Sequence, residues 1–291
     1  MNVKHIGVLA VLLASLMWAI EPVFAKLAYQ QNPDFVQISA IRAIFVTLTA
    51  LIYIGLTRNA KLRIDKQQFS ILAYIAIAGT LFADLLYFFA LTQIPVINAV
   101  LIGHMQPIFI IMIGFLILKS DKLTKFDFAG ISIMMLSGLL VSTKTIENFA
   151  MFKFGTFGDL LVLMATIAWA TTAIAVRKHL KNLNAGVITF YRFLFASIFL
   201  VIYLGLTSTI NITNIYQILV GVVVGIGTIL YYEGLKRIKA AQVSGLELSA
   251  PFFAAILGFL ILGEPLTLIQ IMGISLLFVG IYYLSKKEDI G

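Results

Sequence analysis

Long apolar runs separated by short polar connections fill almost the whole chain. A helix of roughly 20 apolar residues is long enough to cross the hydrocarbon core of a bilayer. Runs suited to this length occupy residues 6–28, 36–57, 69–92, 96–118, 126–143, 156–176, 187–208, 215–235, 240–262 and 266–284. The pattern predicts an all-α integral membrane protein with ten transmembrane helices and little mass outside the bilayer.

The second half of the chain repeats the first, with an offset that stays between 143 and 151 residues. The matched residues are Arg42 with Arg192, Tyr87 with Tyr231, Pro107 with Pro251, and Phe109 with Phe253. Since each repeat holds five apolar runs, an odd number, the second copy must be inverted in the membrane. Inverted repeats build a central site that opens alternately to each side. We therefore expect two five-helix repeats, residues 1–146 and 147–291, and an alternating-access transporter.

Composition and charge place the chain in a cell membrane. Apolar residues make up 61% of the sequence and charged residues 12%. The formal net charge of +8 does not indicate nucleic-acid binding, because the basic residues are spread over short loops rather than gathered on one surface. Sixteen loop Lys and Arg residues fall on one side of the predicted membrane and only three, Lys26, Lys144 and Lys153, on the other. The positive-inside rule then predicts cytoplasmic N and C termini in a plasma-membrane protein.

Two absences narrow the chemistry. The chain has no cysteine, so no disulfide framework or thiolate metal site is expected. No glycine-rich loop ends in the lysine of a nucleotide-binding motif, so we do not expect ATP hydrolysis. The energy for transport is then expected to come from a solute gradient, an ion gradient or exchange. No cofactor is expected.

The C-terminal motif Gly263-Glu264-Pro265-Leu266-Thr267, after Pro251 and Gly258-Phe259-Leu260, resembles the EamA-type branch of the drug/metabolite transporter superfamily. The resemblance implies two inverted five-helix repeats, with helices one, three, four, six, eight and nine around a central cavity. The first repeat departs from the pattern, because Ser120-Asp121-Lys122 stands where the second has Gly263-Glu264-Pro265. Family members handle amino acids, nucleobases, sugars, amines and drugs, so the resemblance does not specify a substrate.

Ionisable side chains at membrane depth are costly and are functional candidates by default. The predicted helices contain seven of them: Glu21, Arg42, Asp84, His104, Arg192, Glu233 and Glu247. By depth along the helices, the first four form an outer group and the last three an inner group. We expect Arg42 to pair with Glu21 or Asp84, and Arg192 to pair with Glu233, in pairings that change during transport.

Alternatives stay open for these residues. For Arg42 and Arg192 we favour helix packing or contact with headgroups over gating. For the four carboxylates we favour a transport role, because an unpaired carboxylate in low dielectric tends to take a proton. His104 could titrate near neutral pH or be a hydrogen-bonded structural residue. The His, Asp and Glu residues lack the spacing of metal ligands, so no metal is expected.

Aromatic residues and prolines complete the candidate site. Trp18 and Trp169 occupy corresponding positions in the two repeats, near the membrane centre. With Tyr87, Tyr231 and Tyr232 they could line an aromatic cavity for amphipathic or cationic solutes, or serve ordinary packing. Helix kinks are expected at Pro22, Pro107 and Pro251. Gly221 and Gly225 have the spacing of close helix packing, which we expect within one chain; both a monomer and a homodimer stay open.

These observations favour a secondary transporter of small organic metabolites, such as amino acids or related amphiphiles, in contact with the lipid bilayer. Export rather than import rests on the family resemblance alone, and protons are a candidate coupling ion. The alternatives are a facilitative carrier or exchanger without proton coupling, a membrane scaffold or receptor, and a lipid-acting membrane enzyme. The short basic loops argue against the enzyme, and the twofold set of buried charges argues against the scaffold.

Overall fold

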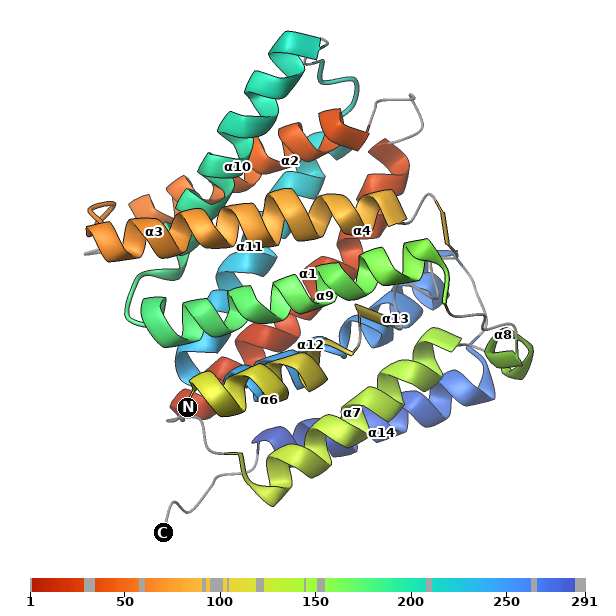
Figure 1. The fold of residues 1–291 in the computed structure, drawn as a ribbon. Coiled ribbons are helices and arrows are strands. Elements are labelled where there is room, and N and C mark those ends of the chain that lie inside the picture. The colour runs from red at the N-terminus through yellow and green to blue at the C-terminus, as the bar shows by residue number, and fades with distance from the viewer. Residues whose placement is uncertain are drawn as a thin grey trace.

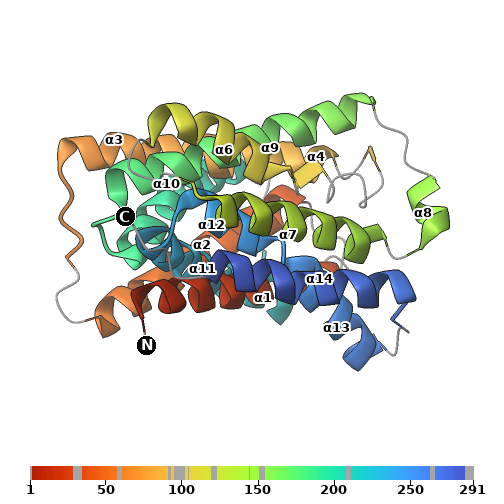
Figure 2. The ribbon, with the colours of Figure 1, turned by 90° about the horizontal axis from the view of Figure 1, so that it is seen from below.

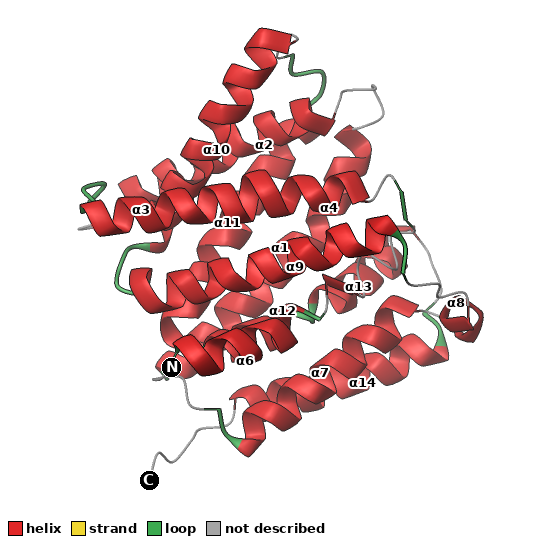
Figure 3. Ribbon diagram, in the orientation of Figure 1, coloured by secondary structure: helices red, strands yellow, loops and turns green. Residues whose placement is uncertain are grey.

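The structure, a computed structural model, describes residues 2–28, 35–57, 61–90, 93–94, 102–103, 105–118, 123–143, 145–150, 155–207, 211–262 and 266–285. All regular structure in these residues is helical (Figures 1 and 3). The first-half elements are α1 (Val3–Ala28), α2 (Phe35–Leu56), α3 (Lys66–Ile75), η2 (Ala76–Asp84), α4 (Leu85–Ala90), α6 (Gln106–Ile117), α7 (Lys125–Thr143) and α8 (Ile146–Ala150). The second-half elements are α9 (Phe157–Ala175), η3 (Val176–Leu180), α10 (Ala185–Thr207), α11 (Ile215–Arg237), α12 (Ala240–Glu247), α13 (Ala250–Leu262) and α14 (Leu268–Ser285).

Seven helices within the described residues are long and apolar enough to cross a membrane. The all-helical prediction is confirmed, whereas the count of ten spans stays a prediction. Part of the fourth predicted span, residues 96–101 and 104, lies outside the described residues. The start of α1 and the end of α14 lie at the same end of the bundle (Figures 1 and 2).

Helices of the first half pair with helices of the second half. The most extensive contacts join α1 to α11, α7 to α14, and α2 to α10. Two further pairs join η2 and α4 to α9, and α6 to α12. Figure 1 shows α7 beside α14, and Figure 2 shows the same pair from below. Each first-half span that is described thus has a partner in the other half, an arrangement that fits a tandem repeat.

Glycines permit the closest of these approaches. A Cβ atom at Gly221 of α11 would lie 2.5 Å from the Cβ of Phe45 and 2.8 Å from the carbonyl oxygen of Arg42. A Cβ at Gly225, one turn later, would lie 2.8 Å from Thr49. The expected packing role within one chain is confirmed for both glycines, because they bring α11 against α2.

The repeat-related prolines interrupt their helices. Pro251 is the second residue of α13, and Leu248 and Ser249 separate α13 from α12. Because proline has no N–H, the carbonyl of Glu247 loses its usual helical partner at this point. Pro107 likewise lies in the first turn of α6. The sequence predicts kinks inside continuous helices at these two prolines. That prediction is wrong, because both prolines lie at the start of a helix instead. Pro22 falls within α1, which continues to Ala28.

Candidate functional site

Three charged side chains meet between α1, α2 and η2. Arg42 Nε lies 3.4 Å from Glu21 Oε1, and Arg42 Nη2 lies 3.6 Å from Asp84 Oδ2. The three side chains are only 13%, 19% and 12% exposed, respectively. We call them the acidic cluster. The predicted pairing of Arg42 is confirmed, and it involves both carboxylates rather than one.

Trp169 of α9 ties the acidic cluster to the second half. Its indole Nε1 donates to Asp84 Oδ1 at 2.9 Å and to the carbonyl oxygen of Gly79 at 3.2 Å. Asp84 therefore pairs with Arg42 of the first half and accepts a hydrogen bond from Trp169 of the second half. A charge-assisted hydrogen bond of this kind is stronger than one between neutral groups.

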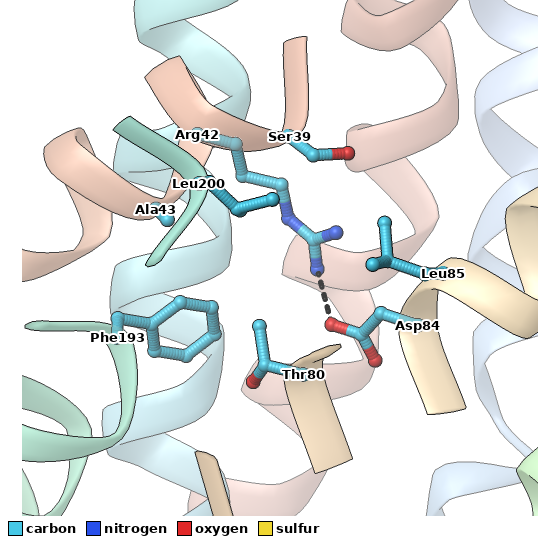
Figure 4. A pocket seen from close by; sticks show the side chains of 8 residues that line it. All are labelled: Ser39, Arg42, Ala43, Thr80, Asp84, Leu85, Phe193 and Leu200. Atoms are coloured by element: carbon cyan, nitrogen blue, oxygen red, sulfur yellow. Dashed lines mark ion pairs between the residues drawn. The ribbon is translucent and has the colours of Figure 1, made fainter. Parts of the chain in front are cut away.

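A small pocket opens beside the acidic cluster, where α2, η2 and α10 approach one another (Figure 4). Figure 4 shows the Arg42 and Asp84 side chains pointing toward each other at this pocket. It is lined by Ser39, Arg42, Ala43, Thr80, Asp84, Leu85, Phe193 and Leu200. One side of the pocket is therefore polar and charged, and the side formed by α10 is apolar.

Arg192 of α10 has different partners from those predicted. Its Nε donates to Thr80 Oγ1 and its Nη1 donates to the Tyr232 hydroxyl, both at 2.9 Å. Glu233 instead forms ion pairs with Lys236 and Arg237. The predicted Glu233–Arg192 pair is therefore wrong.

Helix geometry explains the difference. Residues three and four positions apart share one face of a helix, so both basic residues that follow Glu233 in α11 can reach it. Tyr232 is the neighbour of Glu233 along the chain, but it lies about 100° further round the helix. That rotation turns its hydroxyl toward Arg192 of α10. Sequence reasoning also missed Thr80, because a threonine in an apolar helix commonly bonds its own backbone instead.

The π-helical segment η2 connects both arginines. Asp84 lies at its end and pairs with Arg42, while Thr80, four residues earlier, accepts from Arg192. Gly79 supplies the carbonyl that accepts from Trp169. π-Helical turns are rare and occur frequently at functional sites. The η2 segment thus joins groups from α2, α9 and α10 within six residues.

The predicted aromatic residues form two separate groups. In one, Trp18 and Tyr231 have ring centroids 5.4 Å apart with an interplanar angle of 52°, and Tyr231 also packs on Tyr232. In the other, the Tyr87 and Trp169 centroids are 5.3 Å apart with an interplanar angle of 55°. The Trp18–Tyr231 and Trp169–Tyr87 pairs correspond under the repeat, and each joins the two halves. Their role in a solute cavity stays a prediction.

Glu247 lies at the last residue of α12, directly before the helix break. Its Oε2 atom is buried and has no hydrogen-bond partner in the described part of the chain, and the same holds for the hydroxyls of Ser244 and Ser249. Most buried polar atoms in folded proteins have a hydrogen-bond partner. His104, the expected counterpart of Glu247, lies outside the described residues.

The two halves differ in charge at corresponding positions. With the local offsets of 151 and 144 residues, Thr172 corresponds to Glu21, and Thr228 corresponds to Asp84. Both threonines are buried. The positions that hold the two carboxylates of the acidic cluster in the first half therefore hold neutral threonines in the second half. Among the described residues, no three His, Asp or Glu side chains are close enough together to hold a metal ion.

A bundle of apolar helices that holds charges at membrane depth, with one helix broken beside a carboxylate, is the architecture of a solute transporter. The sequence profile of the EamA-like transporter family matches residues 5–143 and again residues 156–286. This chain belongs to the EamA-like transporter family and is a multi-pass cell-membrane protein.

Known proteins similar to this chain include several transporters. An uncharacterized transporter of Synechocystis, sll1164, is 29% identical over 234 residues, which cover 75% of this chain and 66% of that protein. The uncharacterized inner membrane transporter YhbE of Escherichia coli is 25% identical, with 85% of this chain and 78% of YhbE covered. Protein LicB of Haemophilus influenzae is 21% identical over 97% of this chain and 99% of LicB. A solved crystal structure has a TM-score of 0.77, with 17% identity and 95% of both chains covered, which supports the fold.

Proposed function

We propose that this protein is a secondary transporter that exports small organic metabolites, such as amino acids or related amphiphiles, by alternating access. The observation that carries the proposal is the acidic cluster, because three charged groups held together inside a membrane bundle have a high cost unless they serve the pathway. Arg42, Glu21 and Asp84 come from three different helices, so relative movement of these helices would change the pairing. Such a change in pairing is suited to a gate.

Proton coupling would use a carboxylate that forms no ion pair among the described residues. Glu21 and Asp84 each form an ion pair with Arg42. Glu247 has a buried oxygen without a hydrogen-bond partner among the described residues, so it is the better candidate for carrying a proton. The pairing of the other two carboxylates supports the second candidate, exchange or facilitated transport without proton coupling.

Proteoliposomes test the function directly. Purified protein is reconstituted and offered labelled amino acids, amines and nucleobases with and without an imposed pH gradient. Saturable, gradient-driven uptake that is lost in Glu247→Gln and kept in the exposed control Glu147→Gln supports proton-coupled transport. Uptake indifferent to the gradient supports exchange or facilitated transport. Absence of any uptake by folded protein overturns the proposal, and efflux from loaded cells tests its direction.

We further propose that residues 1–146 and 147–291 are inverted five-helix repeats with both termini in the cytoplasm. The absence of cysteine makes the natural chain a ready background for labelling. A cysteine placed at exposed Asn2 should react with a membrane-impermeant maleimide only after the cells are permeabilised. A cysteine at exposed Glu147, the first residue of the second repeat, should react in intact cells. Labelling of both positions from the same side would refute an odd number of spans in the first repeat.

A further inference from the structure

A basic surface covers one end of the bundle, where α3 begins and η3 ends. Figures 1 and 2 both show the start of α3 at the same end of the bundle as the end of α9, which η3 continues. The helices α3 and η3 are in contact there. Five exposed cations on this surface form no ion pair with a described residue, and we call them the basic patch: Lys61, Arg63, Lys66, Lys178 and Lys181.

The segment before α3 is held against α10. The Tyr191 hydroxyl donates to the carbonyl oxygen of Leu62 at 2.8 Å. Ile64 packs against the main hydrophobic core. Lys61 and Arg63, which flank Leu62, remain exposed. Their charges are therefore presented on an anchored segment, and less conformational entropy is lost when a ligand binds to them.

Acidic side chains do not neutralise the basic patch. Residues 61–75 and 176–190 contain one acidic residue, Asp65. Its Oδ1 atom already accepts a hydrogen bond at 2.7 Å in the capping box that starts α3. We leave Arg177 of η3 out of the patch, because its Nη1 atom donates to the carbonyl oxygen of Leu235 at 2.7 Å. Five cations beside one carboxylate leave this surface strongly positive.

Apolar and aromatic side chains lie next to the cations. Phe69 of α3 is 50% exposed and Leu62 is 40% exposed. The Phe69 ring packs edge-on against Phe195 of α10 with ring centroids 5.4 Å apart, and Tyr191 packs on Phe195 with centroids 5.8 Å apart. Aromatic groups beside Lys and Arg are typical of surfaces that contact the membrane–water interface.

The basic patch lies where membrane-spanning helices end. Lys66 is the first residue of the candidate span Lys66–Tyr87, and Lys178 and Lys181 lie at the end of the candidate span Phe157–Leu180. The ends of spanning helices lie at the depth of lipid headgroups. Basic residues at this depth attract anionic lipids.

We propose that the basic patch binds the phosphate headgroup of an anionic phospholipid, with Leu62 and Phe69 in contact with its acyl chains. Charge complementarity carries the proposal, because the cations are exposed, anchored and close to the bilayer. The site goes beyond the proposed transport function and does not depend on it. It is also separate from the acidic cluster, with which it shares no residue.

The test uses full-length protein in neutral detergent micelles. The protein is titrated with dioleoyl phosphatidylglycerol, or with dioleoyl phosphatidylcholine, which carries the same acyl chains on a headgroup without net charge. Native mass spectrometry counts the bound lipids and gives the apparent Kd. Wild-type protein should bind the anionic lipid roughly 10-fold or more tightly than the neutral one.

Single-charge variants locate the site. Arg63→Gln and Lys178→Gln should each weaken binding of phosphatidylglycerol roughly 5-fold, and the double variant roughly 25-fold, as expected when cations near an anionic headgroup are removed. Lys125→Gln is the matched control, because this lysine is also exposed but begins α7, which lies in another helix pair. It should change the apparent Kd by less than about 2-fold.

Three results would overturn the proposal. Wild-type protein could bind both lipids equally. Lys125→Gln could weaken binding as much as Arg63→Gln, which would mean that total charge rather than the basic patch attracts the lipid. Soluble glycerol phosphate could displace phosphatidylglycerol at equal concentration, which would make the patch a site for free phosphate. Uptake by proteoliposomes is a separate readout, so failure of lipid binding is distinguishable from failure of transport.

Discussion

Removal of the Arg42 charge should destabilise the protein more than removal of the whole acidic cluster. The guanidinium lies 3.4 Å from Glu21 and 3.6 Å from Asp84, and all three side chains are less than one fifth exposed. At an effective dielectric constant of about 20, each contact supplies about 4–5 kcal/mol of attraction before desolvation. Arg42→Gln leaves two carboxylates without their cation, and breaking a buried pair in this way costs about 3–5 kcal/mol.

The triple variant Glu21→Gln, Arg42→Gln, Asp84→Asn removes the charges together. It should stay within about 1–2 kcal/mol of the wild type, because no uncompensated charge is left. Unfolding in mixed detergent micelles, followed by circular dichroism, measures the free energies. Arg63→Gln is the matched control, since this arginine is exposed. The reasoning is refuted if Arg42→Gln is as stable as the control, or if the triple variant is as unstable as the single one.

The triple variant also separates packing from gating. If it folds and still transports, Arg42 has a structural role, the alternative favoured from the sequence. If it folds and is inactive, the charges themselves belong to the transport cycle. Uptake by proteoliposomes that contain equal amounts of folded protein decides between the two.

Three further predictions concern packing and hydrogen bonding. Trp169→Phe should lower the free energy of unfolding by about 1–3 kcal/mol, because buried acceptors lose their donor. Trp18→Phe should lower it less, because the Trp18 indole makes no described hydrogen bond. Equal shifts of the two variants in thermal unfolding would contradict this. Gly221→Ala should lower the free energy of unfolding in detergent by about 1–3 kcal/mol, because the added methyl group overpacks the helix contact. Gly205→Ala should leave it nearly unchanged, because there is open space around a Cβ at this position. Asp127→Asn should lower the free energy of unfolding by about 3 kcal/mol, because it breaks the buried 2.7 Å ion pair with Lys239, which precedes α12. A loss under about 1 kcal/mol in the same assay would argue against this prediction.

The membrane class and most helix positions could be predicted because hydrophobic length is a local property of the sequence. The partner of Arg42 could also be anticipated, since depth along the predicted helices placed Glu21 and Asp84 at the same level. The depth of a residue along its predicted helix does not determine the direction in which its side chain points. For that reason Glu233 was assigned to Arg192, although two basic residues on its own helix compete for it.

The remaining features depend on tertiary contacts. The π-helical turns of η2 have no signature in the apolar sequence around Thr80, yet they place that hydroxyl at Arg192. The helix break before Pro251 was visible as a proline. The burial of a Glu247 oxygen that accepts no hydrogen bond from the described residues instead follows from how α12 packs. Such contacts arise between segments far apart in the chain, where periodicity gives no information.

The cross-pairing of helices has a consequence for biogenesis. Since α1, α2 and α7 each pack mainly on a helix from the second half, the first half leaves the ribosome before its packing partners exist. The faces of these helices that pack on the second half must then wait in contact with lipid or the insertion machinery, although the ion pairs of the acidic cluster have both partners within the first half. The chain is therefore most exposed to quality-control proteases halfway through its synthesis. Two separately expressed halves should be degraded alone and protect each other when they are made together.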